Sequence, residues 1–311
     1  MRSNAVAHST NWDLGWRSNR ARVHLGPSTN KSRKTSCAIA LARHGVRSHL
    51  VTSHSIDDAR RLVETSSSVV VITGAGISTA SGIPDFRGPE GLWTKDPTAE
   101  RLSNIDAFTS SSEIRKASWQ QELVKRANPA QPNPAHQALA AFESEGKLRA
   151  IVTQNIDGLH VAAGSDPRLV IEVHGNSRMT RCLKCGAETS TTVILDRVIA
   201  GDLDPHCDVL VVDATCGGLL KTTVVSFGQP LPHHDFARAE YLAKTCELLI
   251  CIGSTLTVRP VSGLVPKAVS RGARLLIVNA EPTPFDDDAD VVVRGDIPTV
   301  LGPLLGVPVT N

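Results

Sequence analysis

The chain has 311 residues, of which 41% are hydrophobic and 21% are charged, and its formal net charge is +2. These values are typical of a soluble globular protein with one large domain or two small ones. Because no apolar run approaches the roughly 20 residues that a membrane-spanning helix needs, we exclude a membrane role.

Residues 1–56 differ from the rest of the chain in charge. They carry nine Lys and Arg residues against one acid, Asp13, whereas residues 57–311 carry 24 basic and 30 acidic residues. The tail is rich in Ser and Arg and lacks an apolar period, so we expect it to be disordered. We interpret it as a solvated basic tail or the product of an over-called start codon; the alternatives are an organellar transit peptide and an arm that contacts nucleic acid. The acidic balance of residues 57–311 argues against a nucleic-acid surface in that part.

Cysteine usage indicates the compartment. The chain has seven cysteines and shows no signal peptide. This usage predicts a reducing, cytoplasmic location and a metal site rather than a disulfide framework.

The first elements that we expect after the tail are an amphipathic helix over residues 57–65 and a buried parallel strand over residues 69–72, VVVI. Gly74, Ala75 and Gly76 break the strand, and residues 77–80 could open a helix. A strand, a glycine turn and a helix N-terminus together form a cradle for phosphate, because small residues let free N–H groups approach the anion. The alternative is a tight turn between strand and helix that binds nothing.

The loop over residues 82–88, GIPDFRG, separates this chain from the dinucleotide-binding dehydrogenases. Their fingerprint has a third glycine or alanine where this chain has Thr79, and an acidic residue after a second strand. Here Asp85, Phe86 and Arg87 stand side by side instead. Such a loop suits an enzyme that cleaves the cofactor, because a ring can screen the leaving group while charged side chains fix the loop and the phosphates.

The run GAGISTASGIPDFRG resembles the signature of the sirtuins, the NAD-dependent protein deacylases, and further blocks extend the resemblance from Ser68 to Ile297. The resemblance implies that NAD is the co-substrate and that Phe86 screens the emptied nicotinamide site against base exchange. In this part of the chain it implies NAD contacts from Gly74, Ala75, Gly76, Thr79, Asp85, Phe86, Arg87 and Trp93.

Residues 94–132 are polar and helical in part, over residues 111–126, and we interpret them as a small insertion that covers the cofactor loop. The helix that follows has Pro134 in its first turn, where a missing N–H costs nothing. We interpret His136 in this helix as a structural residue.

A strand over residues 149–153 leads into the QNID segment, residues 154–157. Amide side chains at the carboxyl end of a strand lie where doubly wound sheets bind ligands. The alternative is an ordinary turn of Asx type that binds nothing. The similarity to the sirtuin block TQNIDGLH favours binding, and it implies that Gln154, Asn155, Ile156 and Asp157 hold the nicotinamide ribose and carboxamide, with Asn155 and Asp157 also catalytic.

His174 ends the next strand, residues 170–173, and precedes a glycine. A lone histidine is more often structural, but an imidazole with a pKa near 6.5 can accept a proton at neutral pH. The family's HG motif implies that His174 is the general base that deprotonates a ribose hydroxyl. We interpret His160, His233 and His234 as structural or surface residues.

Four cysteines predict a zinc site. The pair Cys182 and Cys185 has C-x2-C spacing, and the pair Cys207 and Cys216 is more widely spaced. Four thiolates around Zn²⁺ make a closed structural site. The wide second spacing resembles the class IV, nuclear branch of the sirtuins. Cys246 and Cys251 flank a buried strand and are expected to be small core residues.

The segment over residues 224–229, VVSFGQ, is similar to the family's FGE-like block, with Gln229 in place of the usual Glu. The resemblance implies that Ser226, Phe227 and Gly228 bind the peptide substrate as an added strand. The alternative is an edge strand without a partner.

Two further strands, residues 248–252 and 274–278, end in small or polar residues. Gly253, Ser254 and Thr255 follow the first and can contact a phosphate or ribose. The resemblance implies that Asn279 and Glu281, after the second, contact the adenosine ribose. It places Ile297, after a last strand within residues 290–297, against the adenine.

Alternating strands and helices predict an α/β fold with a doubly wound, Rossmann-like parallel sheet. We expect it to comprise residues 57–178 and 222–311, with a zinc-binding lobe, residues 179–221, inserted. The resemblance implies that an acyl-lysine carbonyl oxygen attacks NAD, nicotinamide leaves, an alkylimidate forms, and free lysine and O-acyl-ADP-ribose are released.

Three alternatives to deacylation stay open. They are a protein mono-ADP-ribosyltransferase, a non-catalytic module that binds NAD or ADP-ribose, and, more distantly, a redox dehydrogenase. Sirtuins that remove acidic acyl groups use a Tyr and Arg pair near the acyl pocket, and the one tyrosine here, Tyr241, is far from that motif. We therefore expect neutral acyl groups on the substrate lysine.

Overall fold

The computed structural model describes residues 55–85, 91 and 103–308, all of which belong to the compact unit His49–Asn311. Three residues for which we expect NAD contacts, Phe86, Arg87 and Trp93, lie outside the described residues, as does almost all of the basic tail. Within the described part, no helix is long and apolar enough to cross a membrane.

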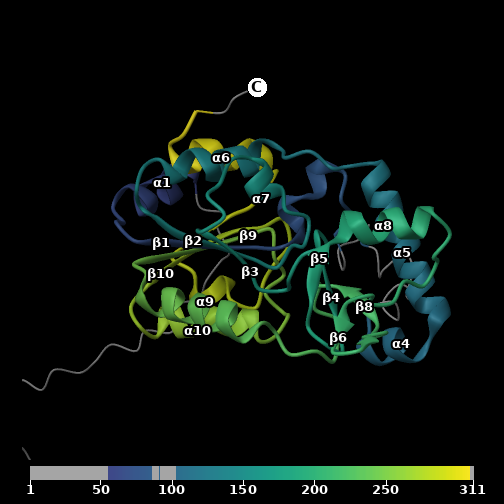
Figure 1. Cartoon of the computed structure of the whole chain (residues 1–311). Helices are drawn as coiled ribbons and strands as arrows, with labels where there is room; N and C mark the ends of the chain where they lie inside the picture. The colour runs from purple at the N-terminus through teal and green to yellow at the C-terminus, as the bar shows by residue number, and fades with distance from the viewer. Residues whose placement is uncertain (1–54, 86–90, 92–102, 309–311) are drawn as a thin grey trace, which may run out of the picture. The chain divides into compact units, whose positions relative to one another are not determined.

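A six-stranded parallel sheet forms the centre of the large domain, in the order β11-β10-β9-β1-β2-β3 (Figure 1). The chain starts in the middle at β1, builds one half outward through β2 and β3, and then builds the other half from β9. This is the doubly wound order, and its switch point lies between β1 and β9. The strands are β1 (Val69–Thr73), β2 (Leu148–Thr153), β3 (Val170–Glu172), β9 (Leu248–Ile252), β10 (Arg274–Val278) and β11 (Val291–Val293).

Alternating residues of β1 face opposite layers of helices. Val69 and Val71 pack in one core with α1 (Ile56–Glu64), α6 (Pro134–Glu143) and α11 (Ile297–Leu305). Val70 and Ile72 pack in the other core, with α9 (His233–Thr245) and α10 (Leu264–Val269). Since both faces of the sheet are covered, a continuous β-branched run is the pattern that such a strand requires. Figure 1 shows α6 and α1 on one side of the sheet and α9 and α10 on the other.

A smaller domain carries the four clustered cysteines. It contains an antiparallel sheet of β4 (Met179–Cys182), β5 (Glu188–Ser190) and β8 (Leu220–Thr222), the hairpin β6 (Leu210–Val211) and β7 (Ala214–Thr215), and α8 (Thr191–Ile199). The wide spacing between Cys207 and Cys216 is therefore filled by the β6–β7 hairpin.

Two helices from an earlier part of the chain complete this domain. They are α4 (Ile105–Ser110) and α5 (Ser112–Ala127). Trp119 of α5 is buried among Leu195, Cys182 and other core residues of the small domain. Arg115 forms two hydrogen bonds of 2.8 and 2.7 Å with the carboxylate of Asp204. The expected cover over the cofactor loop thus belongs in large part to the core of the small domain.

Two local expectations were wrong. No α-helix opens after the first glycine turn: the chain forms the 3-10 helices η1 (Ala75–Ile77) and η2 (Thr79–Ser81) and then turns at Gly82, where φ is +83°. Residues 224–229 do not form a strand, and Phe227 makes a single β-bridge with Asn104. The remaining short elements are α7 (Leu159–Ala162), η3 (Val261–Gly263) and η4 (Asp286–Asp288).

Candidate active site

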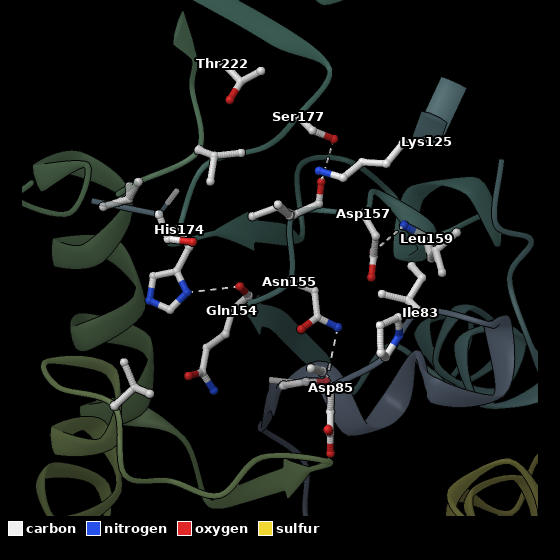
Figure 2. Close-up of a pocket in the computed structure, with 18 of the residues that line it drawn as sticks. Ile83, Asp85, Lys125, Gln154, Asn155, Asp157, Leu159, His174, Ser177 and Thr222 are labelled. Atoms are coloured by element: carbon white, nitrogen blue, oxygen red, sulfur yellow. Dashed lines mark hydrogen bonds between the residues drawn. The ribbon is translucent and has the colours of Figure 1, made fainter. Parts of the chain in front are cut away.

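One cleft lies at the carboxyl ends of the parallel strands and is also lined by residues of the small domain; Figure 2 shows some of the side chains that line it. All of the described residues for which the sequence predicts NAD, substrate or catalytic contacts line it. They are Gly74, Ala75, Gly76, Thr79, Asp85, Gln154, Asn155, Ile156, Asp157, His174, Ser226, Phe227, Gly228, Gly253, Ser254, Thr255, Asn279, Glu281 and Ile297.

The glycine turns after β1 and β9 pack directly on each other. The N–H of Gly76 donates to the carbonyl of Gly253 at 2.8 Å. A Cβ atom added to Gly74 would lie 2.7 Å from the carbonyl oxygen of Gly253, and one added to Gly76 would lie 2.8 Å from its Cα. Backbone packed this closely admits only glycine, so the switch point of the sheet is a small-residue cradle that a dinucleotide can approach.

Asn155 is fixed by the first glycine turn. Its Nδ2 donates to the carbonyl of Gly74 and to Oγ of Ser78, each at 3.1 Å. Both amide protons are therefore used, and the acceptor Oδ1 is the atom that remains to meet a ligand. The side chain is almost completely buried, which holds this orientation.

Ser78 joins Asn155 to Asp157. Its hydroxyl donates to Oδ2 of Asp157 at 2.8 Å and accepts from Asn155, while the other oxygen of Asp157 accepts from the N–H of Leu159 at 2.9 Å. Nε2 of His136 lies 3.4 Å from Oγ of Ser78. Sequence reasoning missed Ser78, because its partners are 58 to 79 residues away along the chain.

A second polar side chain that sequence reasoning missed is Asn133. Its Nδ2 donates to the carbonyl of Ile77 at 2.8 Å and to Oγ of Ser81 at 3.0 Å, while its Oδ1 caps α6 by accepting from Ala135. Asn133 thus binds a carbonyl of the segment that we expected to be helical, residues 77–80, whereas Asn155 binds the carbonyl of Gly74, which precedes that segment. The bond from Asn133 occupies a carbonyl that an α-helix would use, and short 3-10 turns form there instead.

His174 points into the cleft from the end of β3, near Gln154 and Asn155 (Figure 2). Its Nδ1 lies 3.0 Å from the carbonyl oxygen of Gln154, which can only accept, so Nδ1 carries the proton. Nε2 is then the basic atom of the ring. Burial lowers the pKa of His174 below its ordinary value, and the hydrogen bond to Gln154 opposes that effect. A neutral imidazole in a fixed tautomer is suited to accept a proton at neutral pH.

Two buried histidines lie beneath the cleft. Nε2 of His160 is 3.0 Å from Oγ1 of Thr73, and the rings of His160 and His136 are 5.0 Å apart. Burial lowers the pKa of His160 to about 3 and that of His136 to about 4. Both rings are therefore neutral at physiological pH, in agreement with a structural role.

The end of the cleft near β10 is shaped by two hydrogen-bonded side chains. Nδ2 of Asn279 donates to the carbonyl of Glu281 at 2.7 Å. Arg294 donates to the carbonyl of Asn279 at 2.9 Å and forms an ion pair with Asp286. These contacts fold the loop after β10 into a turn that lines the cleft beside Ile297.

The segment over residues 223–228 lies against the segment that carries His174. The N–H of Val225 donates to the carbonyl of His174 at 2.8 Å, and Oγ1 of Thr223 donates to the carbonyl of Asn176 at 2.9 Å. Phe227 is held on its other side, because its N–H donates to Ser103 at 2.7 Å and its carbonyl accepts from Ile105 at 3.0 Å.

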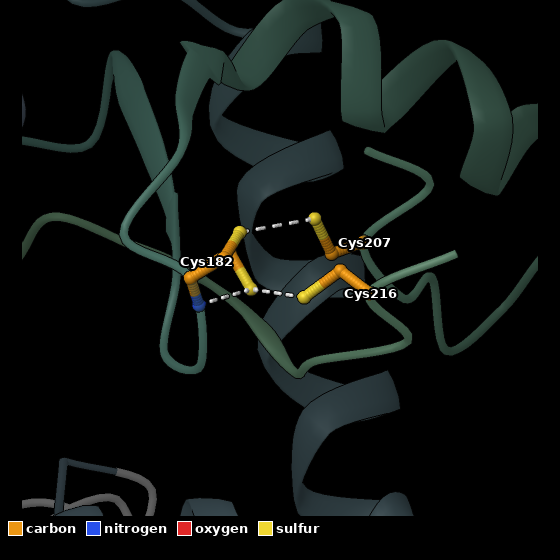
Figure 3. Close-up of side chains that lie close together, drawn as sticks. Cys182, Cys207 and Cys216 are labelled. Carbon is orange, nitrogen blue, oxygen red and sulfur yellow. Dashed lines mark hydrogen bonds between the residues drawn. The ribbon is translucent and has the colours of Figure 1, made fainter. Parts of the chain in front are cut away.

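The four predicted zinc ligands form one cluster in the small domain, with all four sulfur atoms within 4.8 Å of one another (Figure 3). Sγ of Cys182 is 3.6 Å from that of Cys216, and Sγ of Cys185 is 3.7 Å from that of Cys207. A tetrahedron with Zn–S bonds of about 2.3 Å has edges of about 3.8 Å. The cluster therefore fits a closed, structural zinc site, whereas Cys246 and Cys251 are buried in the large domain as expected.

Comparison with known proteins agrees with this geometry. A model of the Sir2 family matches residues 74–260. The chain is 44% identical to NAD-dependent protein deacetylase 2 of Streptomyces coelicolor over 76% of this chain and 96% of that protein. It is 42% identical to the NAD-dependent protein deacetylase of Sulfolobus acidocaldarius over 77% of this chain and 90% of that protein.

Solved structures are similar as well. A Sir2 protein with a deacetylated p53 peptide and 3′-O-acetyl ADP ribose aligns with a TM-score of 0.71 and 34% identity, over 81% of this chain and 98% of that one. A Sir2 protein with a p53 peptide and NAD+ aligns with a TM-score of 0.70 and 34% identity over the same shares.

Proposed function

Because the chain belongs to the Sir2 family, we propose that it is an NAD-dependent protein deacetylase that releases nicotinamide and O-acyl-ADP-ribose. One observation carries the proposal: the paired glycine turns, the QNID segment and a histidine with a basic Nε2 all face one cleft. NAD binding needs a phosphate cradle and polar groups for the ribose, and transfer of the acyl group to a ribose hydroxyl needs a base.

NAD would extend across the switch point of the sheet. The backbone of Gly74 to Gly76 and the Gly253 turn would contact the pyrophosphate, and the loop from Asn279 to Glu281 would contact the adenosine ribose. Oδ1 of Asn155 and the carboxylate of Asp157 would meet the nicotinamide ribose and carboxamide. The contacts of Ser78 with both side chains support this role, because they hold the two groups in one orientation.

The acyl-lysine substrate would reach the same ribose from the side of the small domain. We propose that Ser226, Phe227 and Gly228 bind the main chain of the peptide. The contact between Val225 and the carbonyl of His174 supports this placement, since it ties the peptide-binding segment to the catalytic base. The carbonyl oxygen of the acyl group then attacks the anomeric carbon, nicotinamide leaves, and Nε2 of His174 accepts the proton of a ribose hydroxyl.

Zinc has a structural role in this proposal. Four thiolates complete its coordination, which leaves no position for water or substrate. None of the six described cysteines forms a disulfide, and a reducing environment keeps the thiolates of such a site intact. This supports the cytoplasmic location that we propose.

The decisive experiment is product analysis with the full chain. The protein is incubated with NAD and peptides bearing acetyl-, long-chain acyl- or succinyl-lysine, and the nucleotide products are identified by mass spectrometry. We expect nicotinamide and O-acyl-ADP-ribose from the neutral acyl peptides. ADP-ribosylated protein without O-acyl-ADP-ribose would indicate a transferase instead, and the absence of nicotinamide would indicate a binding module.

A further inference from the structure

Lys221, in β8, is a buried lysine that the proposed mechanism does not use. Its side chain lines the cleft, yet the residue is only 5% exposed. Lysines are almost never buried unless they are paired. Among the described residues, however, no carboxylate lies within ion-pair distance of Lys221; its ammonium group contacts backbone carbonyls and an aromatic ring instead.

Three groups surround this ammonium. It donates to the carbonyl of Val224 and, at 3.4 Å, to that of Thr222. It also lies 5.9 Å from the centre of the ring of Phe108, which is buried in α4. Burial lowers the pKa of Lys221 to about 8, while Glu122 raises it. Lys221 is therefore largely protonated near neutral pH and can donate to a carbonyl and interact with a ring at the same time.

The carbonyl that Lys221 holds belongs to the segment between the base and the peptide site. Val225, the next residue, donates to the carbonyl of His174 at 2.8 Å. Two residues later, Phe227 is held between Ser103 and Ile105, at the start of α4. The ring of Phe108 lies one turn further along the same helix. Lys221 thus contacts both the segment over residues 224–228 and the helix that borders it.

We propose that Lys221 is a positioning residue for the acyl-lysine peptide: by holding the Val224 carbonyl against α4, it sets the path of residues 224–228 so that a peptide bound there is aligned with His174. This inference rests on the proposed deacetylase function. It assigns Lys221 to the peptide side of the cleft, so loss of its ammonium group affects peptide use and spares NAD.

The test compares Lys221→Met, Lys221→Arg and the wild type. Methionine keeps the apolar stem and removes the donor, whereas arginine keeps charge and donors. Hydrogen bonds from charged groups contribute more binding free energy than those from neutral groups. We therefore expect the KM for the peptide to rise at least about tenfold in Lys221→Met. The KM for NAD should stay within about twofold, and Lys221→Arg should restore much of the peptide KM.

The control is Lys147→Met, because Lys147 also donates to a backbone carbonyl, that of Glu64 at 3.2 Å, far from the cleft. It should leave both KM values unchanged. A folded Lys221→Met protein with an unchanged peptide KM would overturn the inference, as would an equal rise in both KM values with a lowered Tm. Should Lys221→Met not fold, the same readings apply to Lys221→Gln and Phe108→Leu. A wild type that deacylates no peptide contradicts the proposed function itself, so the two failures are distinguishable.

Discussion

The carbonyl oxygen of Gln154 lies 3.0 Å from Nδ1 of His174 and accepts a hydrogen bond from its N–H group. A residue at the end of β2 thereby sets the tautomer of a residue at the end of β3, the neighbouring strand of the sheet. The contact uses the backbone of Gln154 and leaves its side chain free to bond elsewhere. The Nε2 atom of that side chain donates to Oγ of Ser254 at 2.9 Å. The orientation of the proposed base is therefore set by two neighbouring strands of the sheet.

Replacement of His174 by alanine should nearly abolish turnover. Loss of a general base typically lowers rates by about 10²–10⁴-fold, and we expect kcat for deacylation to fall within this range while NAD binding persists. Steady-state kinetics and calorimetric titration with NAD measure the two effects. His234→Ala, at an exposed position of α9, is the control and should retain full activity. Near wild-type deacylation by His174→Ala would disprove the assignment of the base.

The sequence predicts the parallel strands well because their burial leaves a simple pattern. The runs that become β1, β9 and β10 are apolar and rich in Val, Ile and Leu, and each ends in the small or polar residues that line the cleft. The C-x2-C pair likewise predicts a metal site, because two thiols at that spacing can bind one ion and a second pair of cysteines follows. In these places the local sequence and the tertiary structure agree.

Contacts between distant segments could not be predicted. Asn133 donates to the carbonyl of Ile77, within the segment that we expected to be helical, and this segment forms 3-10 turns instead. The packing of Trp119 in the core of the small domain could not be predicted either, because an apolar face on a helix does not reveal which domain covers it. The segment over residues 223–228 is similar in this respect, because its backbone partners belong to two segments far away in the sequence.

Alanine at Gly76 should destabilise the switch point and weaken NAD binding. The new Cβ would lie 2.8 Å from Cα and 2.9 Å from the carbonyl oxygen of Gly253, which are backbone atoms that cannot rotate away. Overpacking of this kind costs about 1–3 kcal/mol. Urea unfolding and NAD titration measure the two losses.

Gly263→Ala is the matched control for this substitution. A Cβ at Gly263 meets no atom within 4 Å, and φ is −68°, which any residue adopts. We expect stability equal to or slightly above that of the wild type, because alanine restricts the unfolded chain. If the two alanine variants bind NAD equally well, the close packing of the two glycine turns is not needed for binding.

Removal of zinc should open the small domain and abolish activity. Cys182, Cys207 and Cys216 are part of the same core as Trp119, so we expect a red shift of tryptophan emission when a chelator removes the metal. Since α5 carries Trp119 and also lines the cleft, deacylation should be lost together with this signal. Elemental analysis should find one zinc per chain before treatment and none after it.

Two serine variants separate the metal site from an ordinary buried thiol. Cys216→Ser should lose zinc and activity. Cys246→Ser should keep both, because Sγ of Cys246 contacts only the carbonyl of Ala243 among the described polar groups, at 3.3 Å, and a hydroxyl can make the same bond. Full activity in a Cys216→Ser protein without zinc would contradict the structural role of the site.

The stability of the protein should fall below pH 6.5, and both His160 and His136 contribute, because burial lowers the pKa of each. Burial lowers the pKa of His160 to about 3 in the folded state, whereas in the unfolded chain its pKa is about 6.5. Between these values the unfolded state binds more protons at this histidine, so the contribution of His160 to the free energy of unfolding decreases as the pH falls from 6.5 towards 3 and changes little below that. For one such histidine, the loss amounts to roughly 1.4 kcal/mol at pH 5.5.

Urea unfolding at pH 7.5 and 5.5 should show this loss in the wild type and a smaller one in His160→Gln, whose amide can still bond to Thr73. Zinc content is measured at both pH values, because thiolates also take up protons and both proteins share that contribution. An identical pH dependence of the two proteins would show that His160 is not the group that titrates.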